Sequence, residues 1–347
     1  TNKAKFIESD RMQAVDKQVI SQVLAWLRDG ERCWLATVVE TWGSSPRPVG
    51  SLLACNSEGV MVGSLSGGCV EDDLKDKLLG AELAAEQAQF FSYGVTAEDT
   101  EKFGLPCGGH LNIVIEPQPP NKQTIDQFNQ LYQALNERRW VLRTVDVAKS
   151  SAQLSAAAEP APLRWSHEGQ ILQHTYGPSY QLFIIGAGMV SQYLADMAMM
   201  LDYQVTVCDP REDLLEQFPV DGVAKICDMP AAAVRAHADD HATAIVAMTH
   251  DPRIDDMGLM EALNTQAFYV GAMGSSRTSA NRRERLLTLD VSEQALSRLH
   301  APIGLPIGSK TPPEIAIAVL AEITAERKAK HLEAAESAAT EKSAALA

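Results

Sequence analysis

One stretch in the middle of the chain limits the possible folds more than any other: QLFIIGAGMVSQYLADMAMMLDYQVTVCDPR, residues 181–211. A short apolar run ends at Gly186-Ala187-Gly188, a helical pattern follows, and a second apolar run ends at Asp209. The first glycine permits a tight turn after a strand, and the second lets the backbone approach a pyrophosphate at the helix N-terminus. The pattern predicts a Rossmann-like, doubly wound parallel sheet over residues 181–326.

The residues around this glycine loop are candidates for binding a nucleotide. Asp209 lies about twenty residues beyond the glycines, where an acidic residue accepts a hydrogen bond from a ribose hydroxyl. Arg211 leaves the choice between NAD and NADP open, because an arginine there can meet a 2′-phosphate. Ser191 replaces the third glycine with another small residue. We expect Gly186, Gly188, Ser191, Asp209 and Arg211 to bind the ligand; a scaffold that holds no ligand is the alternative.

The N-terminal part has a different pattern, in which helical and strand-like segments alternate. Apolar residues at helical spacing in VDKQVISQVLAWLRDG and in EDDLKDKLLGAELAAEQAQ predict two helices. The runs CWLATVVET and HLNIVIEP predict strands, the latter ending at Pro117, and SLLACN and GVMVGS predict a hairpin. The chain is thus expected to be α/β, with an N-terminal α+β domain over residues 1–120.

Two segments carry weaker patterns. Residues 121–180 contain the alanine- and proline-rich passage SSAQLSAAAEPAPLRW, and they are expected to be a linker with peripheral structure. Residues 327–347 are alanine-rich and charged, which predicts a tail that is either a solvated helix extension or frayed.

Charge and hydropathy exclude several classes of partner. The chain has 30 Lys and Arg against 45 Asp and Glu, and its net charge of -15 repels nucleic acids and anionic membranes. No apolar run approaches the ~20 residues that span a bilayer, and the N-terminal TNKAKFIESDRMQ lacks the apolar segment of a secretory signal. We therefore expect a cytoplasmic protein with neither nucleic acid nor membrane as a partner.

Two of the six cysteines stand in an unusual setting. Cys69 follows Gly67 and Gly68 and precedes an acidic stretch suited to a first helical turn, so it is placed at a helix N-terminus, where the pKa of a thiol falls. Cys107 precedes Gly108 and Gly109 in a similar way. The alternative is that these glycines only form turns and the cysteines fill space. The remaining four lie in strand-like runs and are expected to be buried: Cys33, Cys55, Cys208 and Cys227.

The C-terminal part also contains a cluster of arginines in SSRTSANRRERL: Arg277, Arg282, Arg283 and Arg285. The cluster suits a phosphate or an acidic partner, and a solvated helix face is the alternative. Thr311-Pro312-Pro313-Glu314 has the spacing of a capping box that opens a helix.

Several segments together resemble the XdhC/CoxI family, accessory factors for molybdenum hydroxylases such as xanthine dehydrogenase. In the N-terminal domain these segments are ETWGSSPRPVG, GSLSGGCVE and CGG, residues 40–50, 63–71 and 107–109. In the C-terminal domain they are the glycine-loop stretch, YVGAMGSSRTSANRRERL and IGSKTPPEIAIAVLAEI. The resemblance covers about residues 15–326.

The resemblance implies a function. Members of the family are understood to bind molybdenum cofactor, to protect it while an oxo ligand is exchanged for sulfide with help from a cysteine desulfurase, and to deliver it to an apo-hydroxylase. It implies that Cys69 is a molybdenum ligand or a sulfur-handling thiol. It also gives Cys107 and the glycines at 67, 68, 108 and 109 a role in approaching the pterin or its phosphate.

The sequence also allows other ligands for the Rossmann loop and other functions for the chain. The Rossmann loop fits a pyrophosphate-bearing form of molybdenum cofactor, NAD(P), or no ligand. A maturation chaperone is favoured over a turnover enzyme. The alternatives are an NAD(P)-dependent oxidoreductase with Cys69 as a reactive thiol, and a non-catalytic scaffold that binds the desulfurase and the target enzyme. The sequence leaves a homodimer open.

Overall fold

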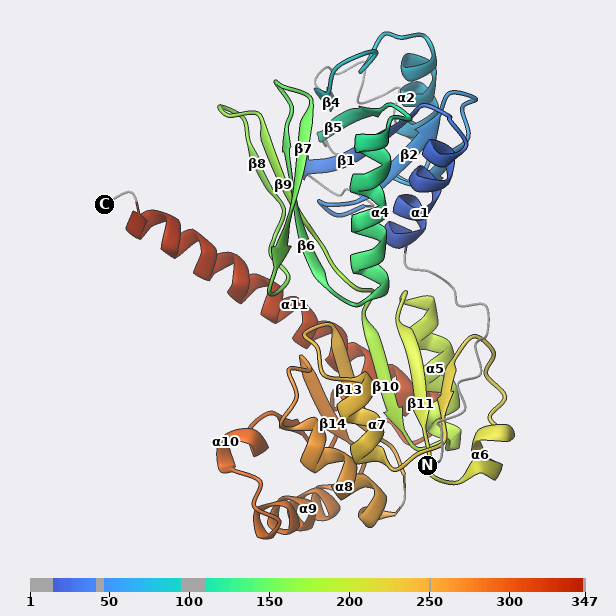
Figure 1. Ribbon diagram of the computed structural model, residues 1–347. Coiled ribbons are helices and arrows are strands. Elements are labelled where there is room, and N and C mark those ends of the chain that lie inside the picture. Colours follow the sequence, from blue (N-terminus) through green and yellow to red (C-terminus); the bar gives the residue numbers. More distant parts are fainter. Residues whose placement is uncertain (1–14, 42–46, 95–109, 250, 346–347) are drawn as a thin grey trace. The chain divides into compact units, whose positions relative to one another are not determined.

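The computed structural model describes residues 15–41, 47–94, 110–249 and 251–345, apart from the side chains of Cys69 and of residues 331–345 (Figure 1). Its contacts divide these residues into two compact units, one of Val15–Pro178 and one that begins at Ser179. Within the described residues, no helix is long and apolar enough to cross a lipid bilayer.

The first unit is built on a five-stranded antiparallel sheet in the order β3-β2-β1-β5-β4. Its strands are β1 (Cys33–Thr41), β2 (Leu52–Asn56), β3 (Met61–Gly63), β4 (Gln89–Tyr93) and β5 (Leu111–Gln118). Leu35 of β1 packs with α1 (Val15–Arg28) and α4 (Lys122–Asn136), whereas Ala36 packs with α2 (Cys69–Leu79). The alternation of β1 therefore buries both faces of the sheet.

The predicted helix after the Gly-Gly pair is shorter than expected, because α2 ends at Leu79. Gly80 follows as its C-cap, and Ala81 and Ala84 adopt positive φ angles of 56° and 45°. Side-chain periodicity cannot reveal such a break, since alanine favours a helix by propensity. The predicted hairpin is confirmed by the antiparallel pairing of β2 with β3, and β5 continues one residue past Pro117.

Residues 121–180, expected to be a linker with peripheral structure, instead form α4 and a second sheet of four strands in the order β7-β6-β9-β8. These strands are β6 (Trp140–Asp146), β7 (Ser151–Ala157), β8 (Arg164–Ser166) and β9 (Ile171–Tyr176). Arg143 of β6 forms a buried, two-pronged ion pair with Glu116 of β5, with both N–O distances at 2.7 Å. The segment belongs to the first unit as far as Pro178. Its alanine-rich strand β7 is mostly exposed, which explains the weak hydrophobic pattern.

The second unit contains a six-stranded parallel sheet in the order β12-β11-β10-β13-β14-β15. Its strands are β10 (Gln181–Ile185), β11 (Gln204–Cys208), β12 (Ala224–Ile226), β13 (Thr243–Ala247), β14 (Tyr269–Ala272) and β15 (Leu299–His300). The strand order reverses between β10 and β13, which is where doubly wound folds bind ligands. The predicted Rossmann-like sheet is confirmed.

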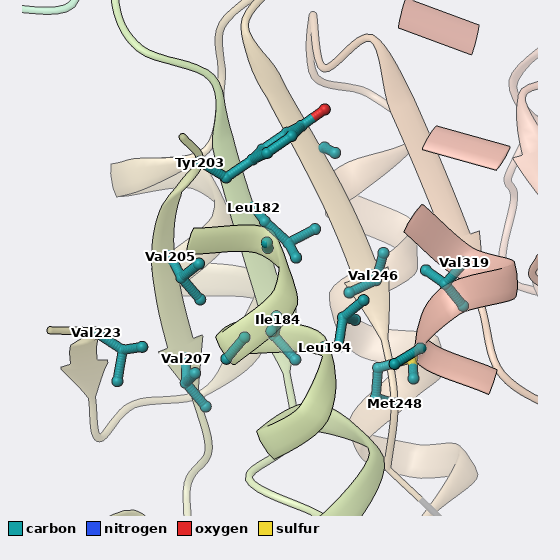
Figure 2. Packing of buried hydrophobic residues seen from close by; sticks show 14 of the residues in the cluster. Leu182, Ile184, Leu194, Tyr203, Val205, Val207, Val223, Val246, Met248 and Val319 are labelled. Atoms are coloured by element: carbon teal, nitrogen blue, oxygen red, sulfur yellow. The ribbon is translucent and has the colours of Figure 1, made fainter. Parts of the chain in front are cut away.

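Helices cover both faces of this parallel sheet. Leu182 and Ile184 of β10 pack with Leu194 of α5 (Met189–Met200) and Val319 of α11 (Pro312–Ala345), as Figure 2 shows. The other face is covered by α7 (Pro230–His237), α8 (Pro252–Ala262) and α9 (Ser276–Thr288), and two shorter helices are α6 (Glu212–Glu216) and α10 (Glu293–Leu296). Residues 327–345 of the expected tail continue α11 as a helix.

Candidate functional site

The glycine loop after β10 has the backbone geometry that a ligand site requires. Gly186 has a φ of 108°, and a Cβ there would lie 2.6 Å from Cγ2 of Thr249, so only glycine fits. Gly188 is the N-cap of α5, and a Cβ there would meet nothing within 4 Å. No side chain caps α5, so the N–H groups of its first turn are candidates for binding an anion.

Asp209, expected to meet a ribose, is held inside the protein. Its carboxylate is fully buried and accepts hydrogen bonds from the Ala187 amide at 2.9 Å, the Arg211 amide at 3.0 Å and the Arg211 guanidinium at 2.8 Å. Burial alone would raise the pKa of Asp209, but the hydrogen bonds from Arg211 and Ala187 outweigh it and lower this pKa. A ribose hydroxyl would reach the carboxylate only if the Arg211 side chain moved away.

Ser191 lies on the buried side of α5 and is fully buried. Its hydroxyl has no hydrogen-bond partner among the described residues. A small residue at this position lets the helix pack closely on the sheet, as the sequence predicts, and its position beneath the loop keeps its hydroxyl away from solvent.

The second candidate region is the turn between β3 and α2 in the first unit. Gly67 and Gly68 have φ angles of 92° and 136°, and α2 begins at Cys69. The predicted helix start at Cys69 is thereby confirmed. The thiol of Cys69 lies outside the described side chains, and Cys107, Gly108 and Gly109 lie outside the described residues altogether.

Glu71 organises this turn, a role that sequence reasoning missed. Its carboxylate accepts hydrogen bonds of 2.9 to 3.2 Å from the amides of four successive residues and of 2.9 and 2.5 Å from two serine hydroxyls. The amides are those of Leu65, Ser66, Gly67 and Gly68, and the hydroxyls are those of Ser64 and Ser66. Burial raises the pKa of Glu71, but these hydrogen bonds outweigh burial and lower it to about 2.

The Glu71 network decides which side of the turn a ligand can use. Because the four amides point at Glu71, they are not free to cradle a phosphate or a pterin. A Cβ on Gly68 would meet nothing within 4 Å, so the outer side of the turn is open to close approach. One signal of the network is visible in the sequence: Glu71 stands three residues after the N-cap, the spacing of a capping box.

Glu40, from the family-like segment over residues 40–50, lies in a second polar cluster of the first unit. It is within 3.1 Å of Nε2 of His167 and accepts a 2.9 Å hydrogen bond from Asn112. The indole of Trp165 donates to Nδ1 of His167 at 3.2 Å and stacks on Phe90. Both ring nitrogens of His167 are therefore engaged, which makes it a structural group in this arrangement rather than a free base.

The predicted arginine cluster is mostly internal. Arg282 is 2% exposed and pairs with Asp255 and Asp256, and Arg283 donates to the carbonyls of Leu296 and Leu299. Arg285 is partly exposed but also pairs with Asp256. These three arginines hold the end of the sheet together, so neither an acidic partner nor a purely solvated face accounts for them.

The other cysteines behave as expected for small apolar residues. Burial raises the pKa of the thiols of Cys33, Cys55 and Cys208 to about 12, 11 and 12. Cys227 is only partly buried. Within the described ranges, no group of three or more His, Cys, Asp or Glu side chains could hold a metal ion.

Two family models match the chain. Residues 182–323 match the XdhC Rossmann domain, and residues 26–94 match the XdhC and CoxI family, which together span more than half of the chain. The chain belongs to the XdhC/CoxI family. The glycine loop of this XdhC/CoxI protein lies in the first match, and its Gly67-Gly68-Cys69 turn lies in the second.

Similar proteins extend over almost the whole chain. A Bacillus subtilis protein that is named as a probable subunit of xanthine dehydrogenase is 27% identical, over 88% of this chain and 96% of that protein. The Escherichia coli "Molybdenum cofactor insertion chaperone PaoD" is 26% identical, over 87% of this chain and 85% of that protein. A solved structure described as a xanthine dehydrogenase from Bacillus halodurans has a TM-score of 0.71 and 25% identity, and covers 91% of this chain and 96% of that one.

Proposed function

We propose that this XdhC/CoxI protein binds molybdenum cofactor as its cargo, supports the sulfuration of that cofactor, and delivers it to a molybdenum hydroxylase such as xanthine dehydrogenase. The proposal draws support from two relatives of similar length, one named as a molybdenum cofactor insertion chaperone and one as a probable part of xanthine dehydrogenase. In this role the protein's partners are the apo-hydroxylase and a cysteine desulfurase.

The observation that carries the proposal is the position of Cys69 as the first residue of α2, after two glycines with positive φ. A helix N-terminus stabilises a thiolate, and a thiolate is a soft ligand that suits a thiophilic metal such as molybdenum. Glu71 holds the turn by accepting hydrogen bonds from its amides, and the outer side of the turn at Gly68 stays open. Cys69 is thus proposed as the molybdenum ligand or the thiol that handles the sulfide.

Within the second unit, taken by itself, the glycine loop is proposed as a site for a phosphate group. The uncapped N-terminus of α5 at Gly188 is suited to a phosphate or pyrophosphate, including that of a pyrophosphate-bearing form of the cofactor. The NAD(P)-dependent alternative has less support, because the carboxylate that would bind the ribose already accepts hydrogen bonds from Ala187 and Arg211.

Titration of the purified chain with molybdenum cofactor tests the proposal. The wild type is expected to bind saturably, and Cys69→Ala is expected to weaken binding by at least about tenfold, or ~1.4 kcal/mol. Cys227→Ala is the matched control, because it removes a partly buried thiol of the other unit. If wild type bound no cofactor, the proposal would fail; if Cys69→Ala bound as well as wild type, Cys69 would not be the ligand.

Delivery is tested by reconstitution. Cofactor-loaded protein mixed with an apo-hydroxylase and a desulfurase is expected to restore hydroxylase activity faster than free cofactor does. Capture of the apo-hydroxylase by a chain that binds no cofactor would favour the scaffold alternative. Turnover of NAD(P)H in the absence of any molybdenum partner would favour the oxidoreductase.

A further inference from the structure

The second unit contains a cavity of about 1060 Å³ that the proposed function does not use. It lies beyond the carboxyl ends of β13 and β14, between the start of α9, residues 302–309 and the start of α11. Thr249 lines the cavity and also packs against Gly186, so it stands between the cavity and the glycine loop. The volume is that of a pocket for a small molecule.

The cavity wall is fixed in place by hydrogen bonds to its neighbours. The amide of Ile303 donates to the carbonyl of Ala272 at 3.1 Å, and the amide of Leu305 donates to the carbonyl of Ala318 at 3.1 Å. Between them, the amide of Gly304 donates to the carboxylate of Glu322 at 2.7 Å. Residues 303–305, which form part of the cavity wall, are therefore tied to β14 and α11.

Arg282 gives one side of the cavity unused donors. Its guanidinium carries five N–H groups and donates to Asp255, Asp256 and the carbonyl of Met273. Two N–H groups of this fully buried side chain therefore have no acceptor among the described residues, although the side chain lines a cavity. Leaving such donors unpaired is costly, so a ligand with acceptor atoms would be stabilised there.

The start of α9 also lines the cavity. The Ser275 hydroxyl caps α9 by accepting from the amide of Thr278 at 3.1 Å, and both side chains line the cavity. The one carboxylate in the cavity lining, that of Asp255, already accepts from Thr249 and Arg282. The lining therefore contains no carboxylate that is free to accept from the remaining N–H groups of Arg282.

Apolar residues also line the cavity. They are Pro302, Ile303, Leu305, Pro306 and Ile315. A cavity lined by both apolar residues and a guanidinium fits a flat ring that carries an oxyanion, because the ring is removed from water while the oxyanion accepts from N–H groups.

We propose that this cavity is a binding site for a heterocyclic or aromatic phosphate monoester or carboxylate, separate from the glycine loop. The inference does not rest on the proposed cofactor role, since it concerns only the chemistry of the cavity. Nucleotides and pterins both include molecules of this class, and the two sources are separated by the experiment.

Calorimetric titration of the full chain with phenyl phosphate tests the site. Saturable binding is expected, at least about fivefold tighter than that of inorganic phosphate because the ring adds apolar burial. Leu305→Trp, which fills the cavity from an exposed position, is expected to weaken binding by about tenfold or more. Ile307→Trp is the matched control, because Ile307 lies in the same exposed loop but does not line the cavity.

Three results would overturn the proposal. The first is no saturable binding of phenyl phosphate up to about 10 mM, a concentration about tenfold above a millimolar Kd. The second is equal loss of binding in the two tryptophan variants. The third is loss of binding in Gly188→Glu, which blocks the glycine loop. Adenosine monophosphate and pterin-6-carboxylate then compete with phenyl phosphate. Displacement by one of them identifies the source of the ring, and displacement by neither shows that the heterocyclic class is wrong.

Discussion

The carboxylate of Asp209 accepts a 2.9 Å hydrogen bond from the amide of Ala187, which joins the end of β11 to the middle of the glycine loop. Arg211 covers the same carboxylate from the solvent side. The acidic residue that a nucleotide-binding fingerprint assigns to the ligand is thus part of the loop's own support. The shape of the loop depends on Asp209 whether or not a nucleotide is bound.

Asp209→Asn is expected to loosen the glycine loop. The Asn side chain keeps one oxygen, which can replace Oδ2, but its NH2 group cannot accept the hydrogen bonds that the Arg211 amide and Nε donate to Oδ1. Its neutral oxygen also accepts more weakly from the Ala187 amide, and about 1 to 3 kcal/mol of stability should be lost. Hydrogen–deuterium exchange over residues 181–211 is expected to speed up at the Ala187 amide. Arg211→Ala is the control, with a smaller loss because its side chain is 45% exposed. Unchanged exchange at Ala187 in the Asn variant would contradict the role of Asp209.

Glu71→Gln is expected to destabilise the first unit by about 1 to 3 kcal/mol, since one amide oxygen cannot replace a carboxylate that accepts six hydrogen bonds. All five tryptophans lie between residues 26 and 165, so tryptophan fluorescence during urea unfolding reports on this unit alone. Asp72→Asn removes a neighbouring carboxylate that is 80% exposed, and little change is expected.

The same carboxylate sets an acid limit on stability. The pKa of Glu71 in the folded chain is about 2, below the ordinary value of 4.5, so its contribution is complete above pH 4.5 and is lost as pH falls toward 2. The Glu71→Gln variant should lose this part of the pH dependence. If the variant and the wild type were equally sensitive to acid, Glu71 would not be the cause of this pH dependence.

His174 should make the first unit less stable in mild acid. Burial, with the charge of Arg143, lowers the pKa of His174 from 6.5 to about 4. The unfolded chain therefore binds a proton between pH 6.5 and 4 that the folded chain does not, and stability falls across this window by on the order of 3 kcal/mol. His174→Phe keeps the ring that contacts Tyr176 and removes the titration. Parallel pH profiles of the two proteins would exclude His174 as the cause.

Much of the second unit could be predicted because its signals are local in the sequence. Residues only a few positions apart determine three of its features: the turn at Gly186, the strands on either side of α5 and the capping of α11. The amides of Lys310 and Thr311 indeed donate to Glu314, as the predicted capping box requires. The family resemblance likewise depended on short segments that remain recognisable when read alone.

The rest depended on contacts between distant residues. The sequence alone predicts a surface position for the charge of Arg282. The fold shows that Arg282 is buried and paired with Asp255, 27 positions earlier. Arg143 and Glu116 likewise join two sheets through a pair that no periodicity reveals. The role of Glu71 was hidden for another reason. Its spacing fits an ordinary first helical turn, and the sequence does not show that the turn before it folds onto the carboxylate.

The last prediction concerns the thiol on which the proposed function depends. In the native chain, Cys33, Cys55 and Cys208 should not react with a disulfide reagent, because burial raises the pKa of each thiol to about 11 or 12. Burial and the charge of Glu212 also raise the pKa of Cys227.

Replacing Cys107 and Cys227 with serine therefore leaves Cys69 as the one thiol expected to react quickly. Its rate should rise with pH around a midpoint below the ~8.5 of a free thiol, since Cys69 begins a helix. Adding Cys69→Ser to the same background should abolish the fast phase. A midpoint at or above ~8.5 would show that the helix start does not activate Cys69, and the thiolate would then not be available as a metal ligand at neutral pH.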